Sequence, residues 1–222
     1  MKNYGTFDIL GPIMVGPSSS HTAGAARLAK IAKQISSEGF CEVEFLLHGS
    51  FASTYQGHGT DKALVAGILG MNPDDERLVN SFELAEKEGI KVKFTETDLG
   101  YEHPNTVKII FKYKNKPDFY ITGSSVGGGN IIITDIDGND VEFTGSHPTI
   151  LLRYKDKKGF ISKISSILAN NKLNIATLNV SRNEDIATLV CELDSEIKDT
   201  TIDEIKDLED ILFINFINPM VR

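Results

Sequence analysis

The stretch Gly16-Pro17-Ser18-Ser19-Ser20-His21-Thr22-Ala23-Gly24 stands at the start of an alanine-rich run with helical spacing. Serines in this position are typical N-caps, and the first turn of a helix presents unpaired N–H groups at the positive end of its dipole. Such a helix start can hold a carboxylate or a phosphate, and His21 adds a ring that changes charge near neutral pH. The alternative interpretation is a plain serine cap followed by an exposed histidine.

A second polar cluster, Gly49–Ala63, follows the apolar run Val43–Leu47, which has the character of a buried strand. It leads into a second apolar helix whose N-cap would be Thr60 or Asp61. His58 lies between two glycines, where the backbone can take positive φ and approach a ligand closely. Neither cluster matches a glycine loop for nucleotides. His58 alone could be a capping or surface residue, but two such loops, each with a histidine and hydroxyls at a helix start, favour one shared ligand site.

The string Gly-Pro-Ser-Ser-Ser-His-Thr at 16–22, together with Gly-His-Gly-Thr-Asp at 57–61, closely resembles the β chain of the two-chain, iron–sulfur-dependent bacterial L-serine dehydratases. The first part of the chain is similar to the allosteric-substrate-binding (ASB) domain of that family, which also occurs in some phosphoglycerate dehydrogenases. The resemblance covers essentially the whole chain. The serine–histidine string is far more specific than a single glycine motif, and the order of the two motifs adds independent support.

The pattern of elements predicts an α+β protein with an N-terminal mixed α/β ASB-like domain over residues 1–146 and an ACT domain over 147–222. In the first domain we expect helices at 20–38, 61–70 and 78–89, and strands at 42–47, 90–95, 106–113, 118–123, 130–136 and 140–143. The glycine-rich segment 123–130 predicts a hairpin with a wide loop, which either is a plain turn, binds an anion or packs closely against another backbone.

The C-terminal part is expected to alternate strand, helix, strand, strand, helix, strand, at 148–154, 161–168, 175–181, 186–193, 201–208 and 211–217. This βαββαβ order predicts a ferredoxin-like fold with an antiparallel sheet. The segment 154–160 resembles the ACT domain of amino-acid-regulated enzymes. That resemblance implies an amino-acid effector bound by Asp156, Gly159 and Phe160, or a module that serves only to pair two copies of the chain.

Composition narrows the class of protein. A net charge of −8 and a pI near 5.2 argue against nucleic-acid binding, and no apolar run approaches the ~18 residues of a membrane span. We therefore expect a cytoplasmic protein that binds neither nucleic acid nor membrane. A [4Fe–4S] cluster needs three or four thiolates, whereas this chain has only Cys41 and Cys191, each interpreted as a small hydrophobic residue. No two histidines have the i,i+4 spacing of a helical zinc site, so we expect no metal bound by this chain itself.

The resemblance implies conversion of L-serine to pyruvate and ammonia, with the [4Fe–4S] cluster held by a separate α chain. This chain would complete the active site, regulate it, or both. Removal of the α-proton needs a positioned base, a role that suits an uncoordinated histidine. We predict His58 as the proton acceptor or the neighbour of the acceptor, oriented by Asp61 or Thr60. His21 and Ser18–Ser20 are expected to hold the substrate or the loop that faces the cluster. The residues expected to bind the substrate are Ser18, Ser19, Ser20, Thr22 and Thr60.

A different class of function remains open at this point. The chain could be a purely regulatory module that senses an anion and an amino acid, as in a phosphoglycerate dehydrogenase, although no dinucleotide fingerprint precedes these domains. His48, at the end of the first predicted strand, is either a structural residue or a second partner of the site. The isolated chain is expected to be inactive and to form a homodimer.

Overall fold

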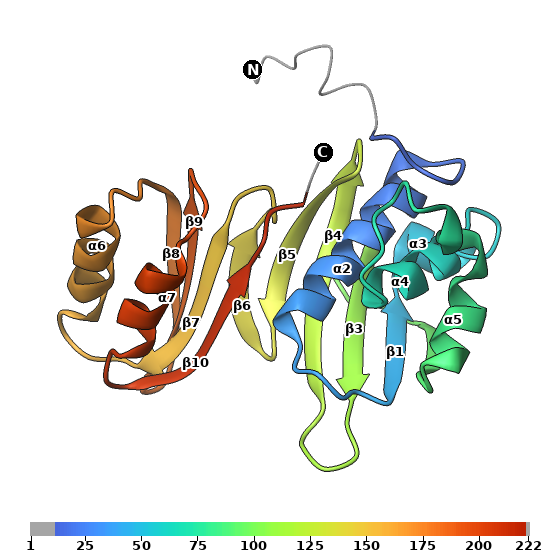
Figure 1. Cartoon of the computed structure of the whole chain (residues 1–222). Helices are drawn as coiled ribbons and strands as arrows, with labels where there is room; N and C mark the ends of the chain where they lie inside the picture. Colours follow the sequence, from blue (N-terminus) through green and yellow to red (C-terminus); the bar gives the residue numbers. More distant parts are fainter. Residues whose placement is uncertain (1–11, 221–222) are drawn as a thin grey trace. The chain divides into compact units, whose positions relative to one another are not determined.

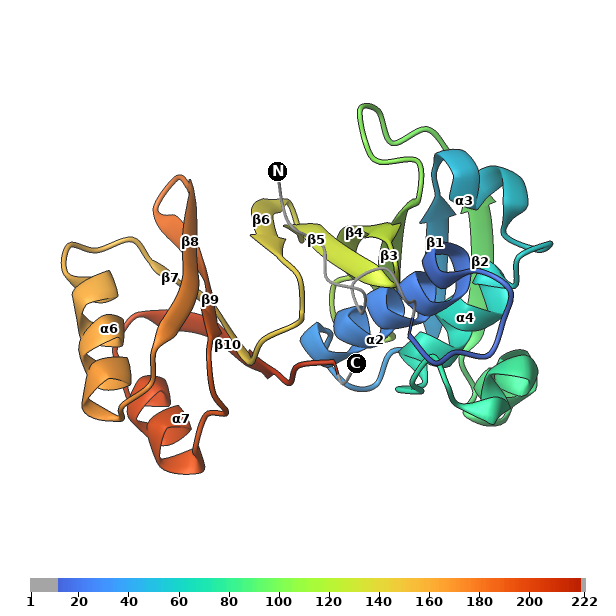
Figure 2. The ribbon, with the colours of Figure 1, turned by 90° about the horizontal axis from the view of Figure 1, so that it is seen from above.

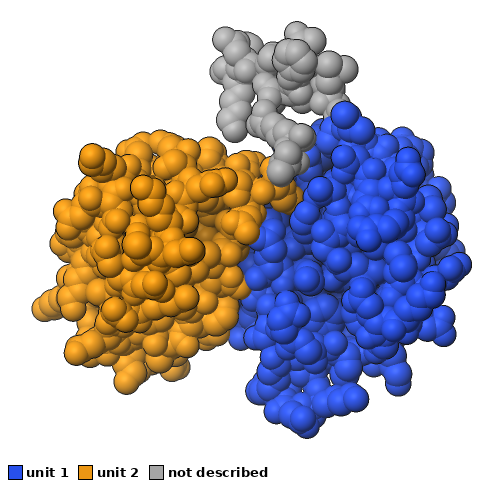
Figure 3. Space-filling model, in the orientation of Figure 1, with its two compact units in different colours: residues 1–137, 222 blue, residues 138–221 orange. Residues whose placement is uncertain are grey.

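The structure is a computed structural model of the chain and describes residues 12–220. These residues form two compact units that divide between Asp137 and Gly138 and are coloured separately in Figure 3. The predicted boundary between 146 and 147 separates the ASB-like and ACT-like family domains, which need not coincide with the compact units, and it stays a prediction. Within the described part of the chain, the helices are too short or too polar to cross a membrane.

The first unit is a β-sheet with its main helices on one face (Figures 1 and 2). In chain order its elements are η1 (Ser19–Gly24), α2 (Ala25–Ile35), β1 (Glu42–Leu47), α3 (Gly49–Thr54), α4 (Thr60–Ile68), η2 (Glu76–Asn80), α5 (Ser81–Lys87), β2 (Lys91–Glu96), β3 (Thr106–Lys112), β4 (Phe119–Gly127) and β5 (Asn130–Ile136). The strand order in this unit is β2-β1-β3-β4-β5. Strands β1 and β2 are parallel, and the other neighbours are antiparallel.

Strand β1 is covered on one face only, unlike the fully buried strand that its sequence suggested. Alternate residues of Val43–Leu47 are fully buried. On the opposite face, Glu44 pairs with Lys93 at 2.7 Å and with Lys112 at 3.0 Å. Hydrogen bonds from these two lysines lower the pKa of Glu44 to about 2, so the carboxylate stays charged and this face stays polar.

Two predictions for the first unit were wrong at the level of secondary structure, and helix α3 is the first. It occupies part of the segment expected to be a polar loop. The helix contributes one fully buried side chain, Phe51, so its sequence carries no helical periodicity. Its small polar residues instead stabilise the turn locally, because Thr54 Oγ1 donates a hydrogen bond to the Ser50 carbonyl at 2.7 Å.

The second correction concerns the predicted wide loop over 123–130. Strands β4 and β5 continue to pair up to a tight turn at Gly128-Gly129, which have φ of 60° and 77°. Gly123 lies inside β4, where a Cβ would be only 2.7 Å from Leu28 Cδ2 of α2. The glycines therefore form a turn and admit a closely packed helix, and no wide anion-binding loop is formed.

The second unit confirms the predicted βαββαβ order. Its elements are β6 (Asn139–Phe143), β7 (Thr149–Lys155), α6 (Phe160–Asn170), β8 (Ile175–Asn183), β9 (Ile186–Leu193), α7 (Asp199–Lys206) and β10 (Ile211–Ile217). Four of the strands form an antiparallel sheet in the order β10-β7-β9-β8, which is the ferredoxin-like arrangement. Side chains from β7, β9 and both helices fill its core, among them Leu152, Ile164, Leu168, Leu189 and Ile205.

In the first unit, helices α2 and α4 pack so closely that their contact requires glycine. A Cβ at Gly67 would overlap the Ala26 carbonyl oxygen and lie 2.5 Å from Ala29 Cβ. Nearer the start of both helices, Thr22 Oγ1 donates a hydrogen bond to the His58 carbonyl at 3.1 Å. Thr22 of η1 contacts His58 just before α4, and Ala26 and Ala29, farther along, contact Gly67 near the end of α4. The continuous stretch of η1 and α2 therefore runs in the same direction as α4, and the start of η1 lies beside the start of α4.

We expect Gly67→Ala to lower the free energy of unfolding by about 1–2 kcal/mol, because overpacking against backbone atoms falls in the upper part, about 2–3 kcal/mol, of its usual range, and helix propensity returns about 1. Urea unfolding at pH 7 measures the change. Gly57→Ala is the matched control, since the nearest atom to its new Cβ is the Thr54 carbonyl oxygen at 3.8 Å. Equal unfolding midpoints for the wild type and Gly67→Ala would contradict the close packing.

Candidate functional site

The two histidine loops meet at the N-terminal ends of η1 and α4. The ring centroids of His21 and His58 are 4.7 Å apart, with an interplanar angle of 76°. The other side of the His21 ring contacts the buried Phe51 ring edge-on, at a centroid distance of 5.4 Å. The prediction that the two loops lie beside each other is therefore confirmed.

Serine hydroxyls hold both ring nitrogens of His21. Nε2 lies 3.0 Å from Ser50 Oγ, and Nδ1 lies 3.2 Å from Ser20 Oγ and 3.4 Å from Ser18 Oγ. Ser18 Oγ also accepts a 3.2 Å hydrogen bond from the backbone N–H of His21, so Ser18 is the N-cap of η1. The predicted serine cap is confirmed, and the orientation of the imidazole is fixed from both sides.

The surroundings of the His21 ring favour its neutral form. Burial lowers the pKa of His21 below its ordinary value of 6.5, and the charge that His58 can carry lowers it further. A neutral imidazole has one donor and one acceptor nitrogen, and a serine hydroxyl can match either of them.

The backbone of His58 is held by hydrogen bonds, whereas its ring forms none with the described residues. Its N–H donates to the Thr54 carbonyl at 3.1 Å, and its carbonyl accepts the hydrogen bond from Thr22. The residue is exposed, and within residues 12–220 its ring nitrogens have no hydrogen-bond partner. Gly59, with φ of 68°, then turns the chain into α4. An exposed imidazole of this kind can exchange a proton with a bound ligand.

Asp61 and Thr60 lie next to His58 in the sequence, but neither bonds to its ring in the part of the chain that the structure describes. Asp61 Oδ1 accepts the backbone N–H of Lys62 at 2.8 Å, and burial raises the pKa of this carboxyl. Thr60 is fully buried, and its Oγ1 has no hydrogen-bond partner among residues 12–220. Their roles in orienting the base and in binding substrate stay predictions.

The other predicted substrate hydroxyls differ in accessibility. Ser18–Ser20 are half-buried in the turn beside His21. Thr22 is 1% exposed, and its hydroxyl already donates to the His58 carbonyl. The serines can therefore reach a ligand, whereas Thr22 ties the two loops together.

Sequence analysis missed Ser50, which belongs to the same site. The first turn of α3 is held by the loop before β3, since Ser50 N–H donates to the Pro104 carbonyl at 2.7 Å. His48 helps to anchor this loop, because its Nδ1 accepts the Leu99 N–H at 3.1 Å. The signal that could have found Ser50 is its position directly after strand β1, within the polar cluster Gly49–Ala63 that also contains His58.

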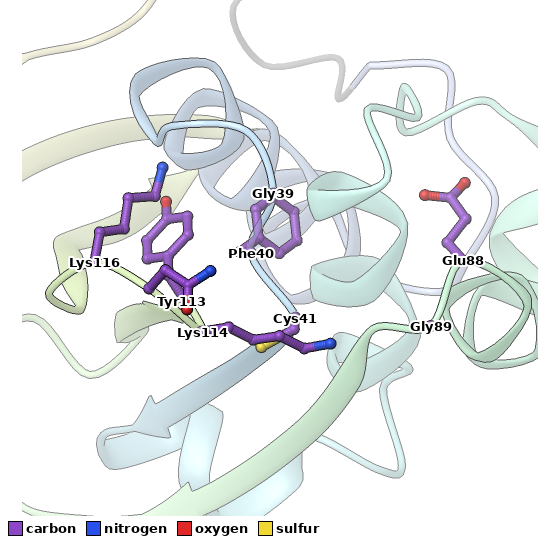
Figure 4. Close-up of a pocket in the computed structure, with 9 residues that line it drawn as sticks. Gly39, Phe40, Cys41, Glu88, Gly89, Tyr113, Lys114 and Lys116 are labelled. Atoms are coloured by element: carbon purple, nitrogen blue, oxygen red, sulfur yellow. The ribbon is translucent and has the colours of Figure 1, made fainter.

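A groove of about 530 Å³ lies at the other end of β1 (Figure 4). Two of its polar groups are engaged by nearby backbone: the Tyr113 hydroxyl donates to the Ser37 carbonyl at 2.9 Å, and Lys116 Nζ donates to the Glu38 carbonyl at 3.1 Å. The predicted site residues do not line it. The histidine site is therefore the stronger candidate.

The two thiols do not fit an iron–sulfur cluster. Cys41 lies in the first unit, where its Sγ contacts the Lys112 carbonyl at 3.6 Å. Cys191 is fully buried in the core of the second unit, where burial raises its pKa to about 11. Among residues 12–220, no group of three or more His, Cys, Asp or Glu side chains is arranged to hold a metal ion.

The predicted effector residues follow strand β7 of the second unit. Asp156 forms a 3.1 Å ion pair with Arg182, and Gly159, with φ of 86°, precedes α6. The Phe160 ring is 4% exposed and stacks on Tyr154 at a centroid distance of 3.7 Å. The structure thus brings Asp156 and Gly159 into one exposed turn, which the Phe160 side chain supports from the core.

These features define a class of protein in which a unit with paired histidine loops is followed by an ACT domain. The serine dehydratase beta chain family matches residues 5–88, and the ACT domain family matches residues 149–210. The L-serine dehydratase beta chain of Peptoniphilus asaccharolyticus is 50% identical over 90% of this chain and 91% of its own length. A probable L-serine dehydratase beta chain of Bacillus subtilis is 39% identical, over 96% and 97%. The chain belongs to the family of L-serine dehydratase beta chains.

A more distant similarity extends to another enzyme. D-3-phosphoglycerate dehydrogenase of Bacillus subtilis is 25% identical over 87% of this chain, which corresponds to 37% of the longer protein. Most of this chain therefore has a counterpart in a protein with a different name.

We expect His58→Gln to raise the pKa of His21, because the substitution removes the neighbouring charge. The pKa should stay below 6.5, since burial is the larger cause and is unchanged. In the wild type, the folded chain binds a proton at His21 less readily than the unfolded chain. The stability contribution of His21 is therefore present above pH 6.5 and is lost as the pH falls through the folded pKa.

NMR titration of the His21 ring in both proteins measures this difference. Phe82→Leu, a change on α5 outside the hydrogen-bond network of the site, is the control for nonspecific effects. A His21 titration that is identical in the wild type and His58→Gln would contradict the electrostatic coupling.

Proposed function

We propose that this chain is one of the two chains of an L-serine dehydratase, which converts L-serine to pyruvate and ammonia. The names of the two beta-chain relatives support serine as the substrate and an alpha chain as the partner. The observation that carries the proposal is the His21–His58 pair, in which serine hydroxyls fix one ring and the other ring is exposed.

In this proposal, the accessible serines of the first loop bind the substrate. Ser18–Ser20 offer hydroxyl donors beside the start of η1, and a carboxylate is stabilised by such donors and by unpaired backbone N–H groups. The neutral His21 ring adds no charge there and maintains the orientation of the hydroxyls. The carboxylate of L-serine is therefore placed beside the two rings.

The exposed ring of His58 accepts the α-proton of the bound serine. This proton is weakly acidic, so its removal needs a base held within hydrogen-bond distance. His58 is supported through its backbone by Thr54 and Thr22, which leaves both ring nitrogens available. Loss of the β-hydroxyl gives aminoacrylate, which hydrolyses to pyruvate and ammonia after release.

Departure of the hydroxyl is assigned to the partner chain, together with the [4Fe–4S] cluster. The reason is chemical, because a [4Fe–4S] cluster needs three or four thiolates. This chain has two: Cys191 is buried in the core of the second unit, and Cys41 lies in the first unit. The chain alone should therefore be free of iron and inactive.

A second candidate function is a regulatory module without chemistry of its own. The similarity to D-3-phosphoglycerate dehydrogenase over most of the chain favours it. In that case the histidine loops bind an anion, and His58 contributes nothing to turnover. The two functions thus differ in the effect of a single substitution.

In the enzyme reconstituted with its partner chain, His58→Ala should lower kcat by about 10²–10⁴-fold with little change in KM, because a general base acts mainly in the transition state. Ser19→Ala or Ser20→Ala should mainly raise KM, since carboxylate binding serves ground and transition states alike. Steady-state rates with L-serine, at matched iron content, measure both effects.

The isolated chain is the control for this experiment, and it should show neither visible absorption from iron nor turnover. Near-normal kcat in His58→Ala would remove this histidine from the chemistry and favour the regulatory function. Stoichiometric iron in the isolated chain would contradict the assignment of the cluster to the partner.

The second unit is proposed to bind an amino-acid effector at the turn of Asp156 and Gly159, and to pair with a second copy of the chain. The ACT family match and the exposed turn support this role. Asp156 can receive the ammonium group of an amino acid, and the positive φ of Gly159 exposes backbone beside it.

Calorimetric titration of L-serine into the full chain should detect binding that Asp156→Asn weakens about tenfold or more, because a charged hydrogen-bond acceptor is lost. Asp207→Asn, an exposed change after α7, is the matched control and should bind as the wild type does. A monomeric chain with no heat of binding would eliminate both roles and leave only the fold.

A further inference from the structure

Ser50 and the serines of the first loop hold the His21 ring from opposite sides. The bond from Ser50 Oγ to Nε2, at 3.0 Å, connects residues far apart in the sequence, whereas Ser20 and Ser18 reach Nδ1 from the same turn. Among the described hydrogen bonds of the His21 ring, the bond from Ser50 is the one that depends on the packing of α3 against η1. The Phe51 ring contact comes from the same helix.

The position of Ser50 is fixed by its backbone. Its N–H donates to the Pro104 carbonyl at 2.7 Å, its carbonyl accepts the Thr54 hydroxyl at 2.7 Å, and Phe51 beside it is fully buried. Because these bonds fix the backbone of Ser50, the main remaining motion of this residue is rotation of its hydroxyl group. In the described part of the chain, that hydroxyl has His21 as its hydrogen-bond partner.

Because the ring is neutral, the hydrogen bonds on its two sides are linked. If the Ser50 O–H donates to Nε2, then Nδ1 carries the proton and donates to Ser20 Oγ. Ser18 Oγ accepts the backbone N–H of His21, so its own proton can point to Ser20 Oγ, 3.4 Å away. Ser20 then accepts twice, and its O–H is directed outward.

The opposite arrangement has a different result. If Nε2–H donates to Ser50, then Nδ1 must accept, and the Ser20 proton is used inside the network. The outward donor would then be on Ser50. Nδ1 has two hydroxyl oxygens beside it, at 3.2 and 3.4 Å, which suits an N–H shared between two acceptors, whereas Nε2 has one hydroxyl beside it, at 3.0 Å.

We propose that Ser50 is a positioning residue that holds His21 in its Nδ1–H tautomer and thereby aims the Ser20 hydroxyl outward as a donor to the substrate carboxylate. The tautomer itself is independent of the reaction, while the substrate in this proposal rests on the proposed function. The two parts can therefore be tested separately.

The first test is made on the isolated full chain, with ¹⁵N-labelled histidine at pH 7. Long-range ¹H–¹⁵N spectra should show a protonated Nδ1 and an acceptor Nε2 at His21 in the wild type. Ser50→Ala should shift the ring toward the Nε2–H form, and Ser50→Thr, which keeps the hydroxyl, should preserve the wild-type pattern. Backbone amide spectra identify any variant that fails to fold, in which case the wild-type and Ser50→Thr spectra alone decide. An Nε2–H ring in the wild type, or an unchanged tautomer in a folded Ser50→Ala, would overturn the proposal.

The second test uses the enzyme reconstituted with its partner chain. Ser50→Ala should raise KM for L-serine about tenfold or more, because the carboxylate loses an aligned donor, while kcat changes much less. Ser50→Thr should restore KM. A changed tautomer with an unchanged KM would contradict the role toward substrate and leave the hydrogen-bond arrangement intact. Absence of serine turnover in the wild-type reconstitution would instead count against the proposed function.

Discussion

The backbone contact between α2 and α4 at Gly67 determines where the groups of the candidate site lie. Neighbouring positions on α2 are equally small, since Ala25, Ala26 and Ala29 are fully buried. Small residues allow two parallel helices to approach until their backbones touch, so there is little freedom to slide or rotate. This contact positions the two helix starts, and the hydrogen bond from Thr22 to the His58 carbonyl then ties the two histidine loops together.

The two histidines of the site differ in their surroundings, although both lie in glycine-containing loops. His21 is partly buried and bonded at both nitrogens, whereas His58 is exposed and held only through its backbone. Burial, and after it the charge that His58 can carry, lower the pKa of His21. The His21 ring can therefore serve as a fixed neutral element of the network beside an exposed ring.

An element could be predicted from the sequence when its own residues carry the pattern that forms it, and not when contacts with other elements decide its structure. All six elements of the βαββαβ order were predicted near their observed positions, because each carries its own apolar pattern and turn residues. Helix α3 has one buried side chain, and Gly123 is small because of Leu28 on another element, so neither left a local signal. The histidine loops were predicted to meet because each carries its own motif of glycine, hydroxyl groups and histidine. Ser50 was missed because its bond to His21 arises only when α3 packs beside η1.

The π-helical form of η1 makes the length of this segment as important as its residues. A π turn contains one residue more than an α turn, and it joins α2 without a break at Ala25. Deleting one residue there would permit an ordinary α-helix, which is a more common structure. It would also rotate everything before the deletion by about 100° around the axis of α2. The His21 ring would then leave Ser50, although every serine and histidine of the loop could still be present. A relative with the same polar residues but a segment one residue shorter should therefore not be assumed to retain the same site.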